Sequence, residues 1–218
     1  MRADMDDPGL NPLVRGQQPS PLLVILSGPS GVGKDAALMR MRELGFPFHF
    51  VVTATDRPER PGEIAGVDYH FLSTAQFRQM IERNEFVEWA EVYGQLKGIP
   101  KYEIRNALGS GKDVVMRVDV QGAATIRSIA PDAILIFMIP ANFDELRDRL
   151  RWRRTDSSED LERRIDTARH ELKRIGDFDY VVVNEEARLD EAVGQIRSII
   201  RAEKQRVRPR QVGPSQFL

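Results

Sequence analysis

The residues best suited to chemistry form the glycine-rich run Gly28-Pro-Ser-Gly-Val-Gly-Lys34, between an apolar segment and a helix-like one. Glycine lets the backbone turn its N–H groups inward toward phosphate oxygens, and the N-terminus of a following helix adds a favourable dipole. Lys34 supplies a mobile positive charge for a phosphoryl group in transfer. The spacing Gly-x4-Gly-Lys in this setting predicts a P-loop rather than a ligand-free turn. The residues expected to bind the phosphates of ATP are Gly28, Pro29, Ser30, Gly31, Val32, Gly33 and Lys34.

The residue after the lysine departs from the usual P-loop. A Ser or Thr hydroxyl there normally ligates Mg²⁺, whereas this chain has Asp35. A carboxylate can ligate Mg²⁺, can repel the β-phosphate, or can favour the helix N-terminus as an early anion. These three roles stay open at the level of sequence. Because Asp35 occupies the slot of the ligating hydroxyl, we expect its carboxylate at or near the Mg²⁺ position.

Composition narrows the classes of protein to consider. The 218 residues include 32 basic and 33 acidic side chains, no cysteine and 41% hydrophobic residues. This apolar fraction is enough for a folded core, and the absence of cysteine excludes disulfides, thiol catalysis and zinc–thiolate sites. A net charge of −1 argues against bulk binding of nucleic acid. The longest apolar run, Ala133–Pro140, is too short to span a membrane. We therefore expect a globular cytoplasmic protein that binds neither nucleic acid nor membrane.

Short segments rich in Val and Ile alternate with helix-like segments through most of the chain. The expected strands are Leu22–Leu26, Val51–Val52, Val114–Val120, Ala133–Ile139 and Tyr180–Val183. The expected helices are Ala36–Leu44, Phe143–Arg151, Ser158–Ile175 and Leu189–Lys204. This order predicts an α/β fold in which helices cover both faces of a parallel sheet.

Other segments break this alternation. The piece from about Asp56 to Gly98 is rich in Arg, Pro, Gly and aromatic residues, which indicates a separate lobe. Residues 1–21 are proline-rich without an apolar stretch, and residues after Arg206 show no periodicity. We expect a flexible extension at 1–21, a folded domain at 22–206 and a flexible tail at 207–218.

Seven blocks of residues, taken in order and spacing, resemble guanylate kinase. They are Ser27–Lys34, Arg57–Glu63, Gly66–Phe71, Glu85–Ala90, Val118–Gly122, Leu150–Asp156 and Asp179–Asn184. The resemblance implies phosphoryl transfer from ATP to GMP or dGMP in purine nucleotide metabolism, with Mg²⁺ accompanying ATP. It also implies a P-loop core (22–53, 100–145 and 165–206), an inserted α+β lobe for the nucleoside monophosphate (54–99) and a helical lid (146–164).

The resemblance assigns a site for the phosphate of GMP to Thr53, Arg57, Arg60 and Tyr69. Two arginines three residues apart in a loop stiffened by Pro and Gly offer forked donors suited to a phosphate dianion. The alternative is a pair of solvated loop charges. Lys97 stands where the family usually has a phosphate-binding tyrosine, and it offers a point charge instead.

The resemblance also implies how the base is recognised. Glu88 would accept hydrogen bonds from guanine N1–H and N2–H₂, unless it is simply an exposed strand carboxylate. Asp119, at the end of an apolar run, would face the guanine or the water shell of the metal. Three departures affect this region: Ile99 replaces a base-contacting hydroxyl, Arg117 an acidic residue, and Asp56 a threonine beside the phosphate loop.

In the lid, Arg149 and Arg153 lie four residues apart, and Arg164 follows on the next helix. By resemblance these arginines close over the polyphosphate and neutralise charge on the moving phosphoryl group. The stretch Arg147–Arg154 would otherwise be a solvated helix face. Asn184 corresponds to a residue near the adenine of ATP.

Two other functions stay open at this level. One is a kinase with a changed acceptor, such as ribose 1,5-bisphosphate. The related ribose 1,5-bisphosphate phosphokinase also has an aspartate after the P-loop lysine, where this chain has Asp35. The other is a non-catalytic module that resembles the guanylate-kinase-like domains of scaffold proteins. Glu88 and the Arg57–Glu63 block argue against the first, and Gly33 and Lys34 against the second.

Overall fold

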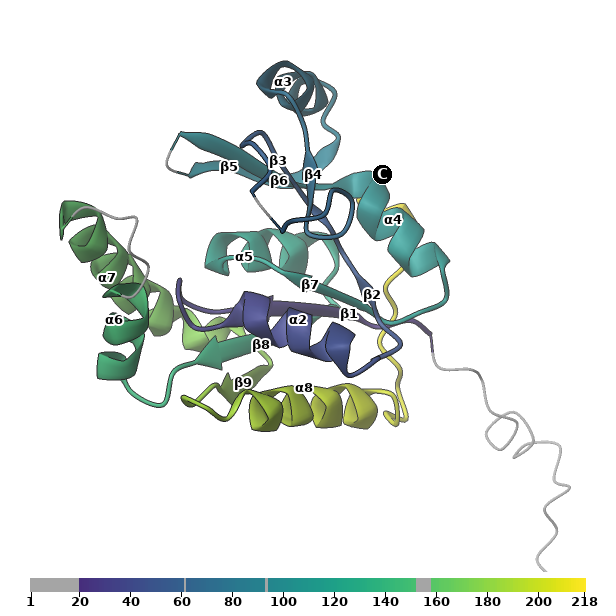
Figure 1. Ribbon diagram of the computed structural model, residues 1–218. Coiled ribbons are helices and arrows are strands. Elements are labelled where there is room, and N and C mark those ends of the chain that lie inside the picture. Colours follow the sequence, from purple (N-terminus) through teal and green to yellow (C-terminus); the bar gives the residue numbers. More distant parts are fainter. Residues whose placement is uncertain (1–19, 61, 93, 152–157) are drawn as a thin grey trace, which may run out of the picture.

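A five-stranded parallel sheet forms the centre of the molecule (Figure 1). The computed structural model describes residues 20–60, 62–92, 94–151 and 158–218. The strand order is β2 (His49–Phe50), β7 (Val114–Arg117), β1 (Leu23–Ser27), β8 (Ile134–Ile139) and β9 (Tyr180–Val183). Each neighbouring pair in this order is parallel. The three central strands are mostly buried on both faces, which explains their continuous apolar sequences.

Helices cover the two faces of this sheet and create two cores. On one face lie α2 (Lys34–Glu43), α6 (Phe143–Arg151), α7 (Ser158–Leu172) and α8 (Leu189–Glu203), against Val24 and Leu26 of β1. On the other lie α4 (Lys101–Gly109) and α5 (Val120–Ile129), against Leu23 and Ile25. Alternate residues of one strand therefore serve different cores. Within the described ranges, none of the helices has the length and apolar character needed to cross a bilayer.

A second sheet of four strands builds a separate lobe, at the top of Figure 1. Its order is β4 (Tyr69–Phe71), β3 (Thr53–Thr55), β6 (Gln95–Pro100) and β5 (Phe86–Val92). The helix α3 (Thr74–Glu82) begins with a capping box between Ser73 and Gln76. A small core of Ala54, Phe77, Phe86 and Leu96 holds this lobe together.

The structure confirms the predicted α/β class and its parallel sheet, with differences at some element ends. Val51–Val52 follow β2 rather than form it, and the last residues of the predicted helix Ser158–Ile175 belong to the 3-10 segment η1 (Lys173–Asp177). The prediction of a strand through Val120 was wrong. The Asp119 carboxylate accepts hydrogen bonds from the N–H groups of Gln121 and Gly122, which ends the strand and starts α5.

The C-terminal segment 207–218 differs from the expected flexible tail. It ends in the 3-10 segment η2 (Pro214–Phe217), which packs on α4. Val212 and Phe217 enter the core between the sheet and α4, where Phe217 is 1% exposed. Arg105 donates to the carbonyl of Phe217 at 2.9 Å. Two apolar anchors separated by polar residues carry no helical or strand period, so the sequence pattern did not reveal them.

We expect Phe217→Ala to lower the free energy of unfolding by about 3 kcal/mol, because it empties a fully buried aromatic position. Denaturant unfolding of the full chain would measure this loss. The matched control is Val207→Ala in the same segment, since Val207 is 98% exposed. Equal stability of the two variants would contradict the docked tail.

Candidate active site

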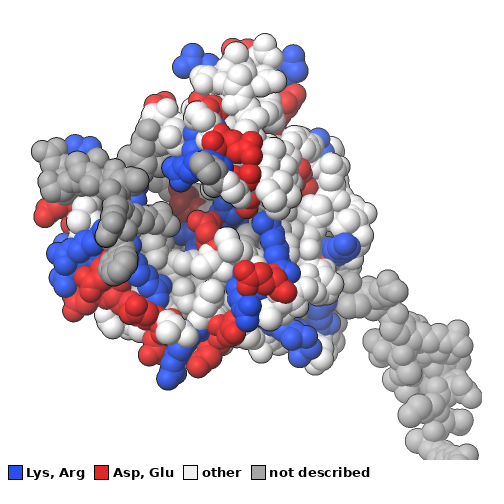
Figure 2. All heavy atoms as spheres, in the orientation of Figure 1, with Lys and Arg blue, Asp and Glu red and all other residues white. Residues whose placement is uncertain are grey.

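A cavity of about 570 Å³ lies between the lobe and the carboxyl ends of β1 and β7. Figure 2 shows a hollow between the upper lobe and the core, bordered by basic and acidic side chains. The cavity unites predicted site residues from both parts of the molecule: Lys34, Asp35, Thr53, Tyr69, Glu88, Lys97 and Asp119. Its volume suits a small-molecule ligand.

The glycine-rich loop joins β1 directly to α2, as the sequence predicts for a P-loop. Gly28, Gly31 and Gly33 have φ values of 139°, 82° and 99°, which glycine adopts readily. A side chain at Gly28 would collide with the carbonyl oxygen of Met138 in β8, and one at Gly33 with the Asn184 amide. The loop therefore lies directly against neighbouring backbone and side chains.

Lys34 points back over this loop. Its Nζ donates to the carbonyl oxygens of Gly28 at 2.5 Å and Pro29 at 3.1 Å. Burial lowers the pKa of Lys34, against the opposing effects of Glu171 and Asp35. Glu171 of α7 accepts a hydrogen bond from the Ser30 N–H at 3.3 Å, as a phosphate oxygen would, and its own pKa is raised by burial. Nothing in the sequence marked Glu171 for this position.

Asn184 and Arg149 hold the loop from the side of β9 and α6. The Asn184 amide donates to the carbonyl oxygen of Val32 at 2.7 Å, and Asn184 is buried. Arg149 donates to Val32 at 3.2 Å and to the Asn184 carbonyl oxygen at 3.0 Å, and it forms an ion pair with Glu145.

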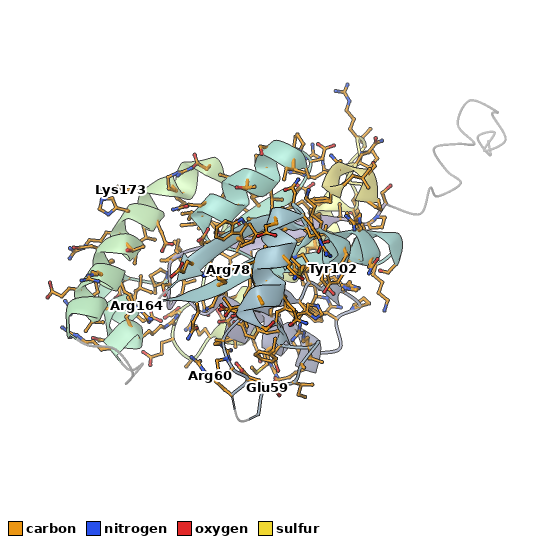
Figure 3. All side chains as sticks on the ribbon, turned by 90° about the horizontal axis from the view of Figure 1, so that it is seen from above. Glu59, Arg60, Arg78, Tyr102, Arg164 and Lys173 are labelled. Atoms are coloured by element: carbon orange, nitrogen blue, oxygen red, sulfur yellow. The ribbon has the colours of Figure 1, made fainter. Side chains whose placement is uncertain are left out.

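The other two predicted lid arginines stand differently. Arg153 lies outside the described residues. Arg164 is on α7, at the left in the view from above (Figure 3). It does not line the cavity.

On the lobe side, Arg57 is buried and lies 4.9 Å from the centre of the Tyr69 ring. It forms a two-pronged ion pair with Glu63, in which Nη1 lies 2.7 Å from Oε2. This hydrogen bonding holds the pKa of Glu63 at about 2. Arg60 is exposed on the outer loop, where Figure 3 labels it, and it contributes its backbone N–H to Glu63. The structure thus joins Arg57 to Tyr69, a residue of the cavity wall, but neither Arg57 nor Arg60 itself lines the cavity.

A β-bulge sets the direction of Glu88. The pairing of β5 with β6 shifts register between Phe86 and Glu88. Phe86 stacks on Phe77 inside the lobe, while the Glu88 carboxylate lies against Gly122 of α5. An extra residue in one strand re-aims the side chains that follow it. Burial, with a smaller contribution from Asp119, raises the pKa of Glu88 to about 7.

Gly122 is a site residue that the sequence reasoning missed. A side chain at this position would occupy the space of the Glu88 carboxylate. The Gly122 N–H also donates to Asp119 at 2.8 Å, so Asp119 shapes the same corner of the cavity. The glycine that ends the block Val118–Gly122 was the available signal.

Asp35 and Arg117, two departures from the family pattern, meet across the cavity. The Arg117 Nε lies 2.5 Å from the Asp35 Oδ1. Arg117 also donates to the Tyr69 hydroxyl at 3.0 Å and lines the cavity. The sequence reasoning noted Arg117 only as a replacement of an acidic residue and missed this pairing.

Comparison with known proteins agrees with this geometry. A family model described as guanylate kinase matches residues 20–203. The rice protein named guanylate kinase 2, chloroplastic/mitochondrial, is 51% identical over 89% of this chain and 68% of its own length. Guanylate kinase of Desulfitobacterium hafniense is 40% identical over 86% of this chain and 92% of its own.

A solved structure supports the same relationship. The crystal structure of guanylate kinase from Anaplasma phagocytophilum is similar with a TM-score of 0.68 and 27% identity, covering 87% of this chain and 89% of that one. These matches favour neither a changed acceptor nor a non-catalytic module. The chain belongs to the guanylate kinase family.

Proposed function

We propose that this enzyme transfers the terminal phosphoryl group of ATP to GMP or dGMP, giving ADP and the nucleoside diphosphate, in purine nucleotide metabolism. One observation carries the proposal. A single cavity holds the P-loop lysine, Lys34, together with Tyr69 and Glu88 from the lobe. A phosphate donor and a purine acceptor bound there would face one another, which is the main requirement for direct transfer. A cytoplasmic location stays a prediction from the sequence.

On the donor side, the backbone of residues 28–34 cradles the phosphates of ATP. The loop is suited to this task because Gly28, Gly31 and Gly33 turn it and α2 begins at Lys34. Lys34 leaves its own loop carbonyls and binds the transferring phosphoryl group. Asn184, next to Val32, borders the nucleotide on the side of β9.

On the acceptor side, residues 54–99 bind GMP. Arg57 and Tyr69, already in contact, take the phosphate, and Thr53 and Lys97 line the same wall. Arg60 closes on the phosphate from the outer loop. Since Glu63 occupies both prongs of Arg57, the phosphate competes with this carboxylate for the guanidinium.

Glu88 selects the base by accepting from guanine N1–H and N2–H₂, donors that adenine lacks in this arrangement. Asp119 borders the same corner. A partly buried carboxylate without a cationic partner in the described contacts is suited to accept these two donors. Ile99 offers the base only apolar contact.

The side chains beside the P-loop fit Mg²⁺. No group of three or more His, Cys, Asp or Glu side chains gathers for a metal within the described residues. Mg²⁺ is commonly held by one or two carboxylates together with substrate phosphates, so Asp35 beside Lys34 is enough on the protein side. Bound there, the ion would neutralise charge on the phosphates of ATP.

In the reaction, an oxygen of the GMP phosphate forms a bond to the γ-phosphorus as the bond from that phosphorus to the β-phosphate oxygen of ATP breaks. Lys34 and the lid arginines Arg149, Arg153 and Arg164 stabilise the charge on the moving group. The segment 146–164 acts as a lid that excludes water, which would otherwise accept the phosphoryl group.

Lys34→Ala should reduce the rate of phosphoryl transfer at least a hundredfold, because it removes a positive charge aimed at the transition state. A coupled assay of ADP release with GMP as acceptor measures this rate. Lys112→Ala serves as the control, since Lys112 is exposed and does not line the cavity. Retention of more than about a tenth of the activity would contradict the proposed role of Lys34.

Glu88→Gln should weaken GMP binding and leave ATP binding nearly unchanged, because an amide cannot accept from both guanine donors. In the unsubstituted protein, GMP affinity should fall as the pH drops below about 7, where Glu88 takes up a proton. The phosphate of GMP also titrates near pH ~6. The measurement is therefore the difference in how GMP affinity, determined by calorimetry, depends on pH in the unsubstituted protein and in Glu88→Gln.

Glu88→Gln should also change the stability of the fold, in a direction that follows from the raised pKa of Glu88. A carboxyl whose pKa rises on folding binds extra protons in the native state, so its contribution to stability is lost as the pH rises from about 4.5 to about 7. Glu88→Gln should thus raise the melting temperature above pH 7 relative to the unsubstituted protein. Glu91→Gln, an exposed change in the same strand, is the control. If the melting temperatures of all three proteins depended on pH in the same way, folding would not raise the pKa of Glu88.

Gly122→Ala should weaken GMP binding at least tenfold while melting at the same or a higher temperature. The new methyl group displaces the Glu88 carboxylate, and alanine is the better helix former by about 1 kcal/mol. Gly194→Ala in α8 is the matched control, because no atom lies near its added methyl group. Calorimetric titration with GMP and thermal melting separate the two effects. Normal GMP affinity in Gly122→Ala would show that the corner next to Glu88 does not hold the base.

A further inference from the structure

Arg117 stands at the meeting point of three elements that the proposed reaction uses. It is the last residue of β7, its Nε pairs with Asp35 in the first turn of α2, and its Nη2 donates to the Tyr69 hydroxyl of β4. Arg117, Asp35 and Tyr69 all line the cavity between core and lobe. The guanidinium is therefore next to both the phosphate loop and the wall of the acceptor.

Two guanidinium groups flank the Tyr69 ring. Arg57 lies 4.9 Å and Arg117 5.4 Å from the ring centre. Each is held by one carboxylate, Arg57 by Glu63 and Arg117 by Asp35. The two arginines come from different parts of the chain, yet each lies against Tyr69 and is paired with a carboxylate, and of the two Arg117 is the one that lines the cavity.

The exposure of Asp35 shows that its contact with Arg117 is easily exchanged. The Arg117 side chain is 20% exposed, whereas that of Asp35 is 61% exposed. A largely hydrated carboxylate contributes little to an ion pair, so an anion that brings two or three oxygens competes well for the guanidinium. The described hydrogen bond and ion pair engage Nη2 and Nε, which accounts for two of the five N–H donors of the guanidinium. The other N–H groups can donate to another anion.

We infer that Arg117 is a further phosphate-binding residue for the acceptor, and that Asp35 holds its guanidinium in the nucleotide-free protein. This inference rests on the proposed function, because it takes the phosphate of GMP to lie against Tyr69. The phosphate displaces Asp35 from Arg117, and Arg57 and Arg117 then grip it from the two sides of the tyrosine. The freed Asp35 carboxylate is left for the Mg²⁺ proposed above.

The first test compares binding of GMP and guanosine, measured by calorimetry without ATP or Mg²⁺. Arg117→Met should weaken GMP binding about ten- to hundredfold, the usual effect of losing hydrogen bonds to a charged group, and leave guanosine binding unchanged. Arg117→Lys should give a smaller loss for GMP alone, because it keeps the charge without the fork. This second variant also keeps the test decisive if Arg117→Met unfolds, which thermal melting would reveal.

Arg42→Met is the matched control for net charge. Arg42 is on α2, where burial and then the nearby Arg117 lower its pKa, but it lies against Phe50 and does not line the cavity. We expect the ratio of GMP to guanosine affinity to change little in this variant. An equal fall in Arg42→Met and Arg117→Met would overturn the inference, because the effect would then come from the general field of the protein.

The second test is a double-substitution cycle. Asp35→Asn should tighten GMP binding about two- to fivefold, since the guanidinium no longer has to leave a carboxylate. The same substitution in an Arg117→Met background should have no effect, because the two residues act through one contact. A gain of equal size in both backgrounds would overturn the inference.

The outcomes separate this inference from the proposed function. If Arg117→Met weakens the binding of GMP and of guanosine equally, or changes neither, the arginine only connects core and lobe. The inference is then wrong, while the proposed function stands. If the unsubstituted protein binds no GMP, the proposed function fails, and the inference fails with it.

Discussion

The close approach of two backbones determines where the chemistry of this protein takes place. Gly28 lies so near the carbonyl of Met138 in β8 that no side chain fits between them. This contact presses the glycine-rich loop onto the edge of the central sheet and sets the start of α2, with Lys34, beside the carboxyl ends of β1 and β7. The carbonyl of Val32 then serves as the attachment point for Asn184 and Arg149. The proposed site for the phosphate donor is therefore built directly on the buried central strands of the parallel sheet.

Carboxylates hold three arginines in and near the cavity. Arg57 is paired with Glu63, Arg117 with Asp35, and Arg149 with Glu145. Each pair keeps a guanidinium in place at little electrostatic cost, because paired charges tolerate partial burial better than isolated ones. In the proposed site, phosphates entering the cavity would exchange one anion for another instead of attracting an unpaired cation. This exchange would reduce affinity, while the geometry of the donors is set in advance.

The proposed recognition of the base by Glu88 depends on a junction between lobe and core. The bulge in β5 directs Glu88 away from the lobe interior, where Phe86 packs, and toward α5 of the core. Gly122 leaves room for its carboxylate, and burial, with a smaller contribution from Asp119, raises the pKa of Glu88. A change in the position of the lobe would move Glu88 relative to Gly122. Guanine recognition is thereby linked to the same lobe position that brings Tyr69 to Arg117.

Features that depend on neighbouring residues in the chain were predictable from the sequence. The P-loop, the central strands β1 and β8 and the helices α2, α6 and α8 follow from local spacing and apolar pattern, and the structure agrees with them. The seven family-like blocks also indicated the guanylate kinase family. Local reasoning failed at Val118–Val120, because the side chain of Asp119 caps a helix where apolar character alone predicts a strand.

Only the tertiary structure decided which distant residues meet. In the sequence, Asp35 and Arg117 are two separate departures from the family pattern. In the structure they form one ion pair, because β7 lies beside β1, and β1 leads into the P-loop and α2. Phe217 enters the core because α4 offers it a surface, and the direction of Glu88 depends on a shift in strand register. Local periodicity carries information about the secondary structure and the buried face of a segment. Contacts between segments depend on how the sheets and helices pack, which no single segment encodes.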